Sequence, residues 1–294
     1  PVVSNGRGAL WELSRGCPFS CSYCYESRGD ATVREIPLAR LEKELDHFSR
    51  IGIERIFVLD PTYNASKKRA LSLLSLIEEK ASGIHFNFEV RAELIDQELA
   101  EAFSRIPCSL QIGLQSVNET ALSLVHRPVD FKKFATGITR LNNAGIVFGM
   151  DLMYGLPGDN LKGFKRSLDY AIARYPNNLE IFRLAVLPGT DLFDRAASLG
   201  IMHDHEPPYH VVSTPTFPVR EIERAERLAG AADFFYTQGR AVSWFLAALH
   251  PLGMRPSQFL SAFAAFTAYR DADRSGAVDH RAIETVQLAF LEEQ

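Results

Sequence analysis

Short apolar runs alternate with longer amphipathic stretches along the first two thirds of the chain. A short apolar run bounded by turn residues is typical of a strand, whereas apolar positions that recur every three or four residues indicate a helix. By this pattern, strands are predicted at residues 9–13, 56–59, 86–90, 110–114, 146–152 and 179–186. Helices are predicted between them, at residues 38–48, 70–81, 94–103, 119–125, 131–144 and 161–173.

This order of elements predicts an α/β fold. Six strand-then-helix units with apolar strands are typical of a parallel sheet covered by helices. Right-handed crossovers would curl such a sheet into part of a barrel, with functional groups on the loops that follow the strands. We therefore expect a partial (β/α)6 barrel over residues 1–200. Residues 201–294 are predicted to form a helical C-terminal region, with one long helix or two at 219–249 and further helices at 256–269 and 280–291.

Composition limits the classes of partner and the location. The 294 residues carry a formal net charge of -4, so no general attraction to nucleic acid or to membranes is expected. No apolar run approaches membrane-spanning length. Four cysteines, three of them clustered, indicate metal binding in a reducing compartment rather than disulfides. We read no secretory signal and expect a cytoplasmic location.

The chemistry is concentrated in the loop after the first predicted strand. Cys17, Cys21 and Cys24 follow the spacing C-x3-C-x2-C, and no fourth cysteine lies nearby. A structural zinc site takes four protein ligands, and a simple ferredoxin cluster takes four cysteines. Three thiolates would instead hold three irons of a [4Fe-4S] cluster and leave the fourth iron open to a substrate or cofactor. Thiols without metal, or a zinc site that borrows a distant ligand, are the alternatives.

The spacing, with an aromatic residue before the last cysteine, resembles the cluster motif of the radical S-adenosylmethionine (radical SAM) superfamily. The resemblance implies an enzyme in which the amino and carboxylate groups of SAM chelate the open iron. It implies that an electron from the cluster cleaves SAM to a 5'-deoxyadenosyl radical, and that an external one-electron reductant supplies that electron. The same partial barrel is implied as well.

Polar residues at later strand ends extend this resemblance. Residues 113–116, Arg127 and residues 151–158 are similar, in that order, to the oxygen-independent coproporphyrinogen oxidases and to cobalamin-binding relatives within the superfamily. By this resemblance Glu89 and Gln115 contact the ribose or the methionine part of SAM. Arg127 is then the partner of the methionine carboxylate, a group that a guanidinium fork holds well.

Further SAM contacts are implied at other strand ends. Asp151 would hydrogen-bond the nucleoside, while Tyr23 and the backbone near Leu187 would lie against the adenine. Many members carry Gly-Gly-Glu after the second strand to meet the SAM amine; this chain has Asp-Pro-Thr, whose backbone carbonyls could accept the same hydrogen bond. The complete set of predicted cofactor-binding residues is Tyr23, Asp60, Pro61, Thr62, Glu89, Gln115, Ser116, Arg127, Asp151 and Leu187.

A branch of the superfamily is indicated by three segments. Residues 14–24, Leu-Pro-Gly-Thr at 187–190 and Pro-Pro-Tyr at 207–209 are similar to cobalamin-binding radical SAM proteins, in which a cobalamin domain precedes the barrel. The resemblance implies cobalamin as a further cofactor and methyl transfer to an unactivated carbon of a small-molecule or peptide substrate. Because the chain begins at Pro1, we expect that such a domain is missing from its start.

Two alternatives to the methyltransferase stay open. One is a cobalamin-independent oxidoreductase of the coproporphyrinogen-oxidase type. The other is a non-catalytic relative that binds the cluster or SAM, such as a haem carrier. No catalytic residue is assigned, and the sequence does not name the substrate.

Two weaker patterns concern metals. Residues 271–279 imitate the start of a calcium loop, but Ala282 stands where the bidentate Glu should be, so a solvated turn is expected. His203, His205 and His210 lie in a loop and are expected at the surface, with metal binding or proton transfer as the alternative.

Two single residues are also open to more than one interpretation. Cys108 enters a predicted strand and is expected to behave as a small core residue, with a radical-quenching thiol as the alternative. For Arg91 two interpretations stay open: a contact with SAM or substrate, or an ion pair with Glu93.

Overall fold

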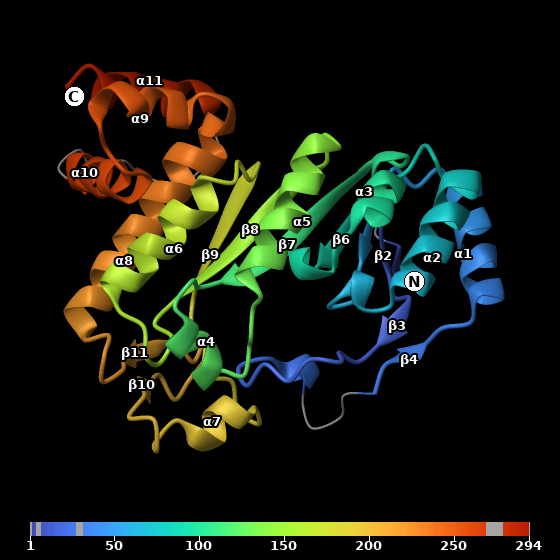
Figure 1. The fold of residues 1–294 in the computed structure, drawn as a ribbon, viewed down its shortest axis with the longest axis horizontal. Coiled ribbons are helices and arrows are strands. Elements are labelled where there is room, and N and C mark those ends of the chain that lie inside the picture. Colours follow the sequence, from blue (N-terminus) through green and yellow to red (C-terminus); the bar gives the residue numbers. More distant parts are fainter. Residues whose placement is uncertain (1, 4–6, 28–31, 269–278, 294) are drawn as a thin grey trace. The chain divides into compact units, whose positions relative to one another are not determined.

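The computed structural model describes residues 2–3, 7–27, 32–268 and 279–293 (Figure 1). The chain divides into two compact units. The first comprises residues 1–113, 126–149 and 189–191, and the second comprises residues 114–125, 150–188 and 192–294. These units do not coincide with the predicted division at residue 200, and the predicted domain assignment stays a prediction.

The predicted α/β class is confirmed. The main strands follow the order β1-β2-β5-β6-β7-β8-β9, and the pairs β2–β5, β5–β6 and β6–β7 are parallel. The boundary between the units falls within β7 and β8. The bounds of the strands are β1 Val2–Val3, β2 Gly8–Trp11, β3 Ser14–Arg15, β4 Arg34–Glu35, β5 Arg55–Val58, β6 His85–Val90, β7 Cys108–Gln115, β8 Val147–Tyr154, β9 Asn178–Arg183, β10 Met202–His203 and β11 Val211–Ser213.

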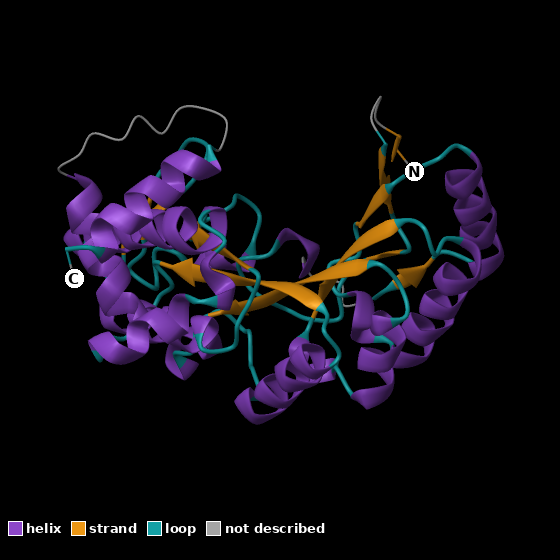
Figure 2. Cartoon of the chain, turned by 90° about the horizontal axis from the view of Figure 1, so that it is seen from above, coloured by secondary structure: helices purple, strands orange, loops and turns teal. Residues whose placement is uncertain are grey.

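In the first unit, helices cover one face of the strands. The helices α1 (Leu38–Arg50), α2 (Lys67–Lys80), α3 (Gln97–Ser104) and α5 (Phe131–Asn143) pack against one another in chain order. Figures 1 and 2 show α1, α2 and α3 along one side of β2, β5 and β6. Asp96 and Asp130 precede α3 and α5, and each accepts a hydrogen bond from a backbone N–H of the first turn, which fixes the start of the helix.

The other face of the same strands is open. Successive side chains of a strand point to opposite faces, and in β6 Phe86 and Phe88 are buried whereas Glu89 is exposed. Leu10 and Phe57 are partners across β2 and β5, and both are more than two fifths exposed, at 41% and 45%. The helix-free face therefore offers apolar and polar side chains to a ligand.

The second unit is mainly helical. Its helices α6, α8 and α10 pack together, and Phe235 lies 5.1 Å from Phe259 and 4.8 Å from Phe263, measured between ring centroids. Of the two possibilities for residues 219–249, one long helix or two, the structure shows a break near Arg240, whose φ of 50 is left-handed. The bounds of the remaining helices are α4 Glu119–Leu124, α6 Leu161–Ile172, α7 Asp191–Arg195, α8 Val219–Ala232, α9 Phe245–Leu252, α10 Pro256–Ala268 and α11 His280–Leu291. Within the described ranges, no helix combines the length and apolar character that crossing a bilayer requires.

A glycine in α5 sets how closely that helix approaches the turn after β6. A Cβ built on Gly137 would collide with the backbone carbonyl of Ala92, which begins the short helical turn η3 (Ala92–Leu94). We expect Gly137→Ala to lower the free energy of unfolding by about 1–3 kcal/mol, because backbone atoms cannot rotate away from the new methyl group. Chemical denaturation measures the change.

Gly83→Ala is the matched control, since its Cβ would have no atom within 4 Å. Its free energy of unfolding should change by no more than about 0.5 kcal/mol. Equal stabilities for the two variants would contradict the close crossing of α5 over η3.

Candidate functional site

The buried carboxylate of Asp60, which follows β5, forms hydrogen bonds with the start of the cysteine loop. The backbone N–H groups of Leu13 and Ser14 donate to Asp60 Oδ1 over 2.8 and 3.2 Å, and the Ser14 hydroxyl donates to Oδ2. Burial raises the pKa of the Asp60 carboxyl above its usual value, although these hydrogen bonds oppose the shift. The side chain of Asp60 is thus used to place the loop, a role that the sequence analysis did not foresee.

The loop turns at a glycine before its first cysteine. Gly16 has a φ of 94, and a Cβ there would collide with the carbonyl of Thr32. Cys17 and Cys21 are buried, with exposures of 8% and 6%, and Cys24 is half-buried; none of the three forms a disulfide.

The arrangement of the thiols differs from that of a site for one ion. Among the residues that the structure describes, no group of three His, Cys, Asp or Glu side chains converges on a single metal position. An iron-sulfur cube has a different requirement, because each thiolate binds an iron of its own.

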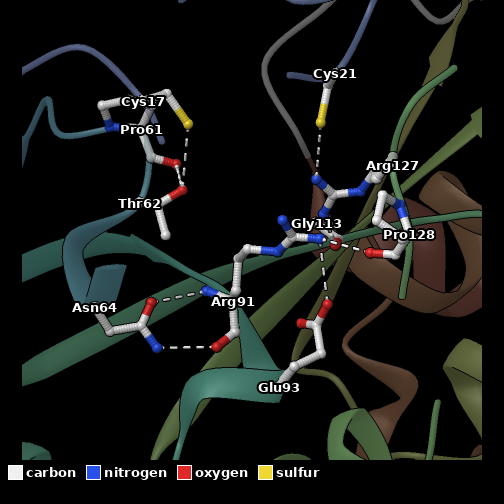
Figure 3. A network of polar contacts seen from close by, with 10 residues as sticks. All are labelled: Cys17, Cys21, Pro61, Thr62, Asn64, Arg91, Glu93, Gly113, Arg127 and Pro128. Carbon is white, nitrogen blue, oxygen red and sulfur yellow. Dashed lines mark hydrogen bonds and ion pairs between the residues drawn. The ribbon is translucent and has the colours of Figure 1, made fainter. Parts of the chain in front are cut away.

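Arg127 reaches the loop from the segment after α4. Its Nη1 donates to Cys21 Sγ over 3.6 Å and its Nη2 donates to the carbonyl of Gly113, as Figure 3 shows. The side chain is buried, yet its Nε has no hydrogen-bond partner among the described residues. Burial opposes the charge of Arg127, but the nearby Tyr23 and Cys21 outweigh burial and raise its pKa above the ordinary value.

Tyr23 and Thr62 lie beside the cysteines. Burial raises the pKa of the Tyr23 phenol, and its neighbours include Arg127 and Cys21. The Thr62 hydroxyl lies 3.9 Å from Cys17 Sγ and donates to the carbonyl of Pro61 over 2.7 Å. The predicted contacts of these residues with SAM stay predictions.

A second guanidinium lies in the same network. Arg91 Nη2 donates to Glu93 Oε1 over 3.3 Å and to the carbonyl of Pro128 over 3.1 Å (Figure 3). The ion pair between Arg91 and Glu93, one of the two interpretations of Arg91 from the sequence, is therefore present in the structure. The backbone of Arg91 is held by the Asn64 side chain, which the sequence analysis did not single out.

Several buried polar atoms of the first unit have no hydrogen-bond partner among the described residues. Buried polar groups normally have one, so a polar ligand or water would satisfy such an atom. A carboxylate in particular would satisfy a guanidinium N–H. The atoms are Ser22 Oγ, Asn87 Oδ1, Glu93 Oε2 and Arg127 Nε.

The other predicted SAM contacts have separate surroundings. Glu89 is exposed on the open face of β6, opposite Gln111 of β7 in the register. In the second unit, Asp151 and Leu187 are half-buried.

Gln115 and Ser116, at the end of β7, also belong to the second unit. Gln115 has a φ of 68, and its buried Oε1 has no partner among the described residues. Ser116 is fully buried and donates to Asp159 Oδ2 over 2.9 Å. The hydroxyl of Ser116 is thus used within the fold, and its predicted contact with SAM stays a prediction.

Of the two weaker sequence patterns considered next, the structure describes Cys108 but not most of the calcium-loop-like run. Cys108 is half-buried, its thiol donates to the carbonyl of Phe103, and burial raises its pKa to about 12, which suits a core thiol. Residues 271–278 of the calcium-loop-like run lie outside the described residues.

The loop histidines are of two kinds. His205 is exposed, whereas His203 and His210 are half-buried. In the described ranges none of them belongs to a group that could hold a metal ion.

The chain matches known proteins over most of its length. The model of the Radical SAM superfamily matches residues 11–171. The cobalamin-dependent radical SAM methyltransferase TokK of Streptomyces tokunonensis is 24% identical over 195 residues, which are 63% of this chain and 28% of TokK. The chain spans 28% to 42% of the length of the first curated relatives that it matches.

Two solved structures share the fold. The radical SAM methyltransferase TsrM from Kitasatospora setae, with cobalamin and a [4Fe-4S] cluster bound, aligns with a TM-score of 0.61 and 18% identity, over 97% of this chain and 61% of TsrM. Coproporphyrinogen III oxidase (HemN) from Escherichia coli, a radical SAM enzyme, aligns with a TM-score of 0.50 and 18% identity, over 76% of this chain and 58% of HemN.

Iron binding should depend on the loop cysteines alone. After anaerobic reconstitution we expect about four irons and four sulfides per chain, as a [4Fe-4S] cluster requires. Cys17→Ala, Cys21→Ala and Cys24→Ala should each lose most of this iron, because each removes one of only three ligands. Cys108→Ala should keep it. Iron and sulfide assays measure the content; a single zinc ion in the wild type, or equal loss in Cys108→Ala, would contradict the assignment.

Proposed function

The chain belongs to the radical SAM superfamily, and from this premise we propose that it is the barrel part of a cobalamin-dependent methyltransferase that acts on an unactivated carbon. In this proposal the chain uses a [4Fe-4S] cluster and SAM, and an external one-electron reductant is its partner. The substrate is a small molecule or a peptide, and the location is cytoplasmic. The single observation that carries the cofactor part is the buried Arg127, which donates to Cys21 through Nη1 while its Nε has no hydrogen-bond partner among the described residues.

Three thiols would hold the cluster. Cys17, Cys21 and Cys24 would each bind one iron through the thiolate, which leaves one iron for the amino and carboxylate groups of SAM. When bound, the cluster and SAM supply one-electron cleavage of the sulfonium. The loop keeps two of the thiols away from bulk water, since Cys17 and Cys21 are less than a tenth exposed.

Arg127 has two tasks in this site. Its guanidinium lies 3.6 Å from Cys21 Sγ, and at that distance two unit charges near a protein surface attract by about 4 kcal/mol. The positive charge of Arg127 would therefore stabilise a thiolate bound to iron at this position. Its Nε is left to hold the methionine carboxylate of SAM.

The amine of SAM would be held by backbone atoms after β5. The carboxylate of Asp60 holds Leu13 and Ser14 of the loop, so we assign the amine to backbone carbonyls of residues 60–62 instead, as proposed from the sequence. The carbonyls of Pro61 and Thr62 each accept one hydrogen bond already, and a carbonyl oxygen can accept a second. Glu89, exposed on the open face of β6, is assigned to the ribose hydroxyls.

The methyltransferase part of the proposal rests on likeness to TokK and TsrM, both named as radical SAM methyltransferases. The likeness to HemN favours a second candidate, a cobalamin-independent oxidoreductase. A non-catalytic relative that binds the cluster or SAM is the third.

Removal of Arg127 should weaken SAM binding while the cluster stays in place. Loss of a hydrogen bond to a charged group costs about 1.5–3 kcal/mol, which corresponds to a roughly 10- to 150-fold higher dissociation constant. We expect this change for Arg127→Ala in the reconstituted protein, measured by equilibrium dialysis with labelled SAM and normalised to iron content.

Arg105→Ala is the control, because Arg105 is exposed and pairs only with Glu78 and a carbonyl in the contacts described. Its SAM affinity should equal that of the wild type. An unchanged affinity in Arg127→Ala with full iron content would remove the assigned role.

Cobalamin should distinguish the candidate functions. We expect the reconstituted chain, supplied with a strong reductant, hydroxocobalamin and methyl-labelled SAM, to transfer label to cobalamin, which chromatography detects. Cys21→Ala should transfer none. Formation of 5'-deoxyadenosine without label on cobalamin would favour the oxidoreductase, and neither product would favour the non-catalytic relative.

A further inference from the structure

In the cysteine loop, the aromatic ring of Phe19 makes a cation–π contact with the guanidinium of Arg91. Phe19 lies between Cys17 and Cys21 and is half-buried. The guanidinium carbon of Arg91 lies 4.0 Å from the centroid of the Phe19 ring. A guanidinium over a ring face is attracted to it, more strongly when the cation is withdrawn from water, and Arg91 is only 6% exposed.

Arg91 is held at both ends, so its position is well defined. Asn64 Oδ1 accepts from the Arg91 N–H over 3.0 Å, and Asn64 Nδ2 donates to the Arg91 carbonyl over 2.9 Å. At the far end, Nη2 donates to Glu93 and to the carbonyl of Pro128 (Figure 3). A side chain fixed in this way can act as a clamp for the ring that it touches.

The same guanidinium connects the loop to the segment that carries Arg127. Pro128 follows Arg127 directly, so Arg91 contacts the loop through Phe19 and the Arg127 segment through a carbonyl. The two guanidinium groups repel each other, and burial together with Arg127 lowers the pKa of Arg91. Glu93 is one negative partner, and thiolates of a loaded loop would be others.

We propose that Arg91 is a positioning residue that clamps the cluster loop through Phe19 and provides a second fixed positive charge beside the loop cysteines. The inference rests on the proposed function, since it concerns the cluster that the loop would hold. It has two separable consequences. The stacked ring slows the loss of iron, and the charge makes the cluster easier to reduce, because a fixed positive charge favours the addition of an electron to an anionic cluster.

Four variants separate the stacking from the charge. Arg91→Lys keeps the charge but loses the planar fork and the stacking. Phe19→Leu removes the ring and keeps the apolar bulk. Arg91→Met removes the charge and keeps most of the stem. Arg105→Met removes an exposed charge elsewhere in the first unit and is the control.

The experiment compares reconstituted wild type and variants by two readouts, iron release to a chelator and the midpoint potential of the cluster. We expect Arg91→Lys and Phe19→Leu to release iron about 2- to 30-fold faster than the wild type, from the energy range of a cation–π contact. Their potentials should stay near that of the wild type. Arg91→Met should release iron faster and also shift the potential to a more negative value, whereas Arg105→Met should change neither.

Several results would overturn the inference. If both Arg91→Lys and Phe19→Leu release iron at the wild-type rate, the Arg91–Phe19 contact does not hold the loop. If Arg91→Met leaves the midpoint potential unchanged, the charge of Arg91 does not affect reduction of the cluster. Thermal unfolding of the cluster-free proteins checks the fold, and Arg91→Gln replaces Arg91→Met if the latter fails to fold. A wild type that assembles no [4Fe-4S] cluster contradicts the proposed function, whereas a loaded wild type with indifferent variants contradicts only the role of Arg91.

Discussion

A buried positive charge next to a cysteine is the constraint on which the rest of this site depends. The guanidinium of Arg127 is removed from water, and such a charge is stable only where hydrogen bonds and opposite charge replace its hydration. The carbonyl of Gly113 and the thiol of Cys21 supply part of that replacement. Because its Nε still lacks a described partner, the folded chain has a position of positive potential and unsatisfied hydrogen bonding beside the loop.

Three carboxylates of the chain differ in their exposure and in what they contact. Asp60 and Asp159 are buried and bind backbone or hydroxyl groups of the fold, Asp60 at the loop and Asp159 at Ser116. Glu89, in contrast, is exposed on the open face of β6. Carboxylates that hold the fold and a carboxylate exposed on the sheet are thus alike in the sequence, and only their contacts and exposure distinguish them.

Local periodicity was enough to predict the six main strands and the helices between them, because each pattern is contained within a few turns or a few strand residues. It did not predict the short α7, β10 and β11. The C-x3-C-x2-C spacing and the family resemblance it carries are equally local. The sequence could not show that Asn64 holds Arg91, or that Arg91 meets Phe19, since these contacts join residues far apart in the chain. The pattern of residues 219–249 was compatible with one helix or two, and the structure shows the break near Arg240, which follows Gly239 and has a positive φ.

The hydrogen bonds from Leu13 and Ser14 to Asp60 make the conformation of the cysteine loop dependent on the sheet. Asp60 follows β5 and lies 47 residues from Leu13, so these bonds require β5 to lie beside β2. The start of the loop therefore owes its shape to the folded unit and not to the loop segment alone.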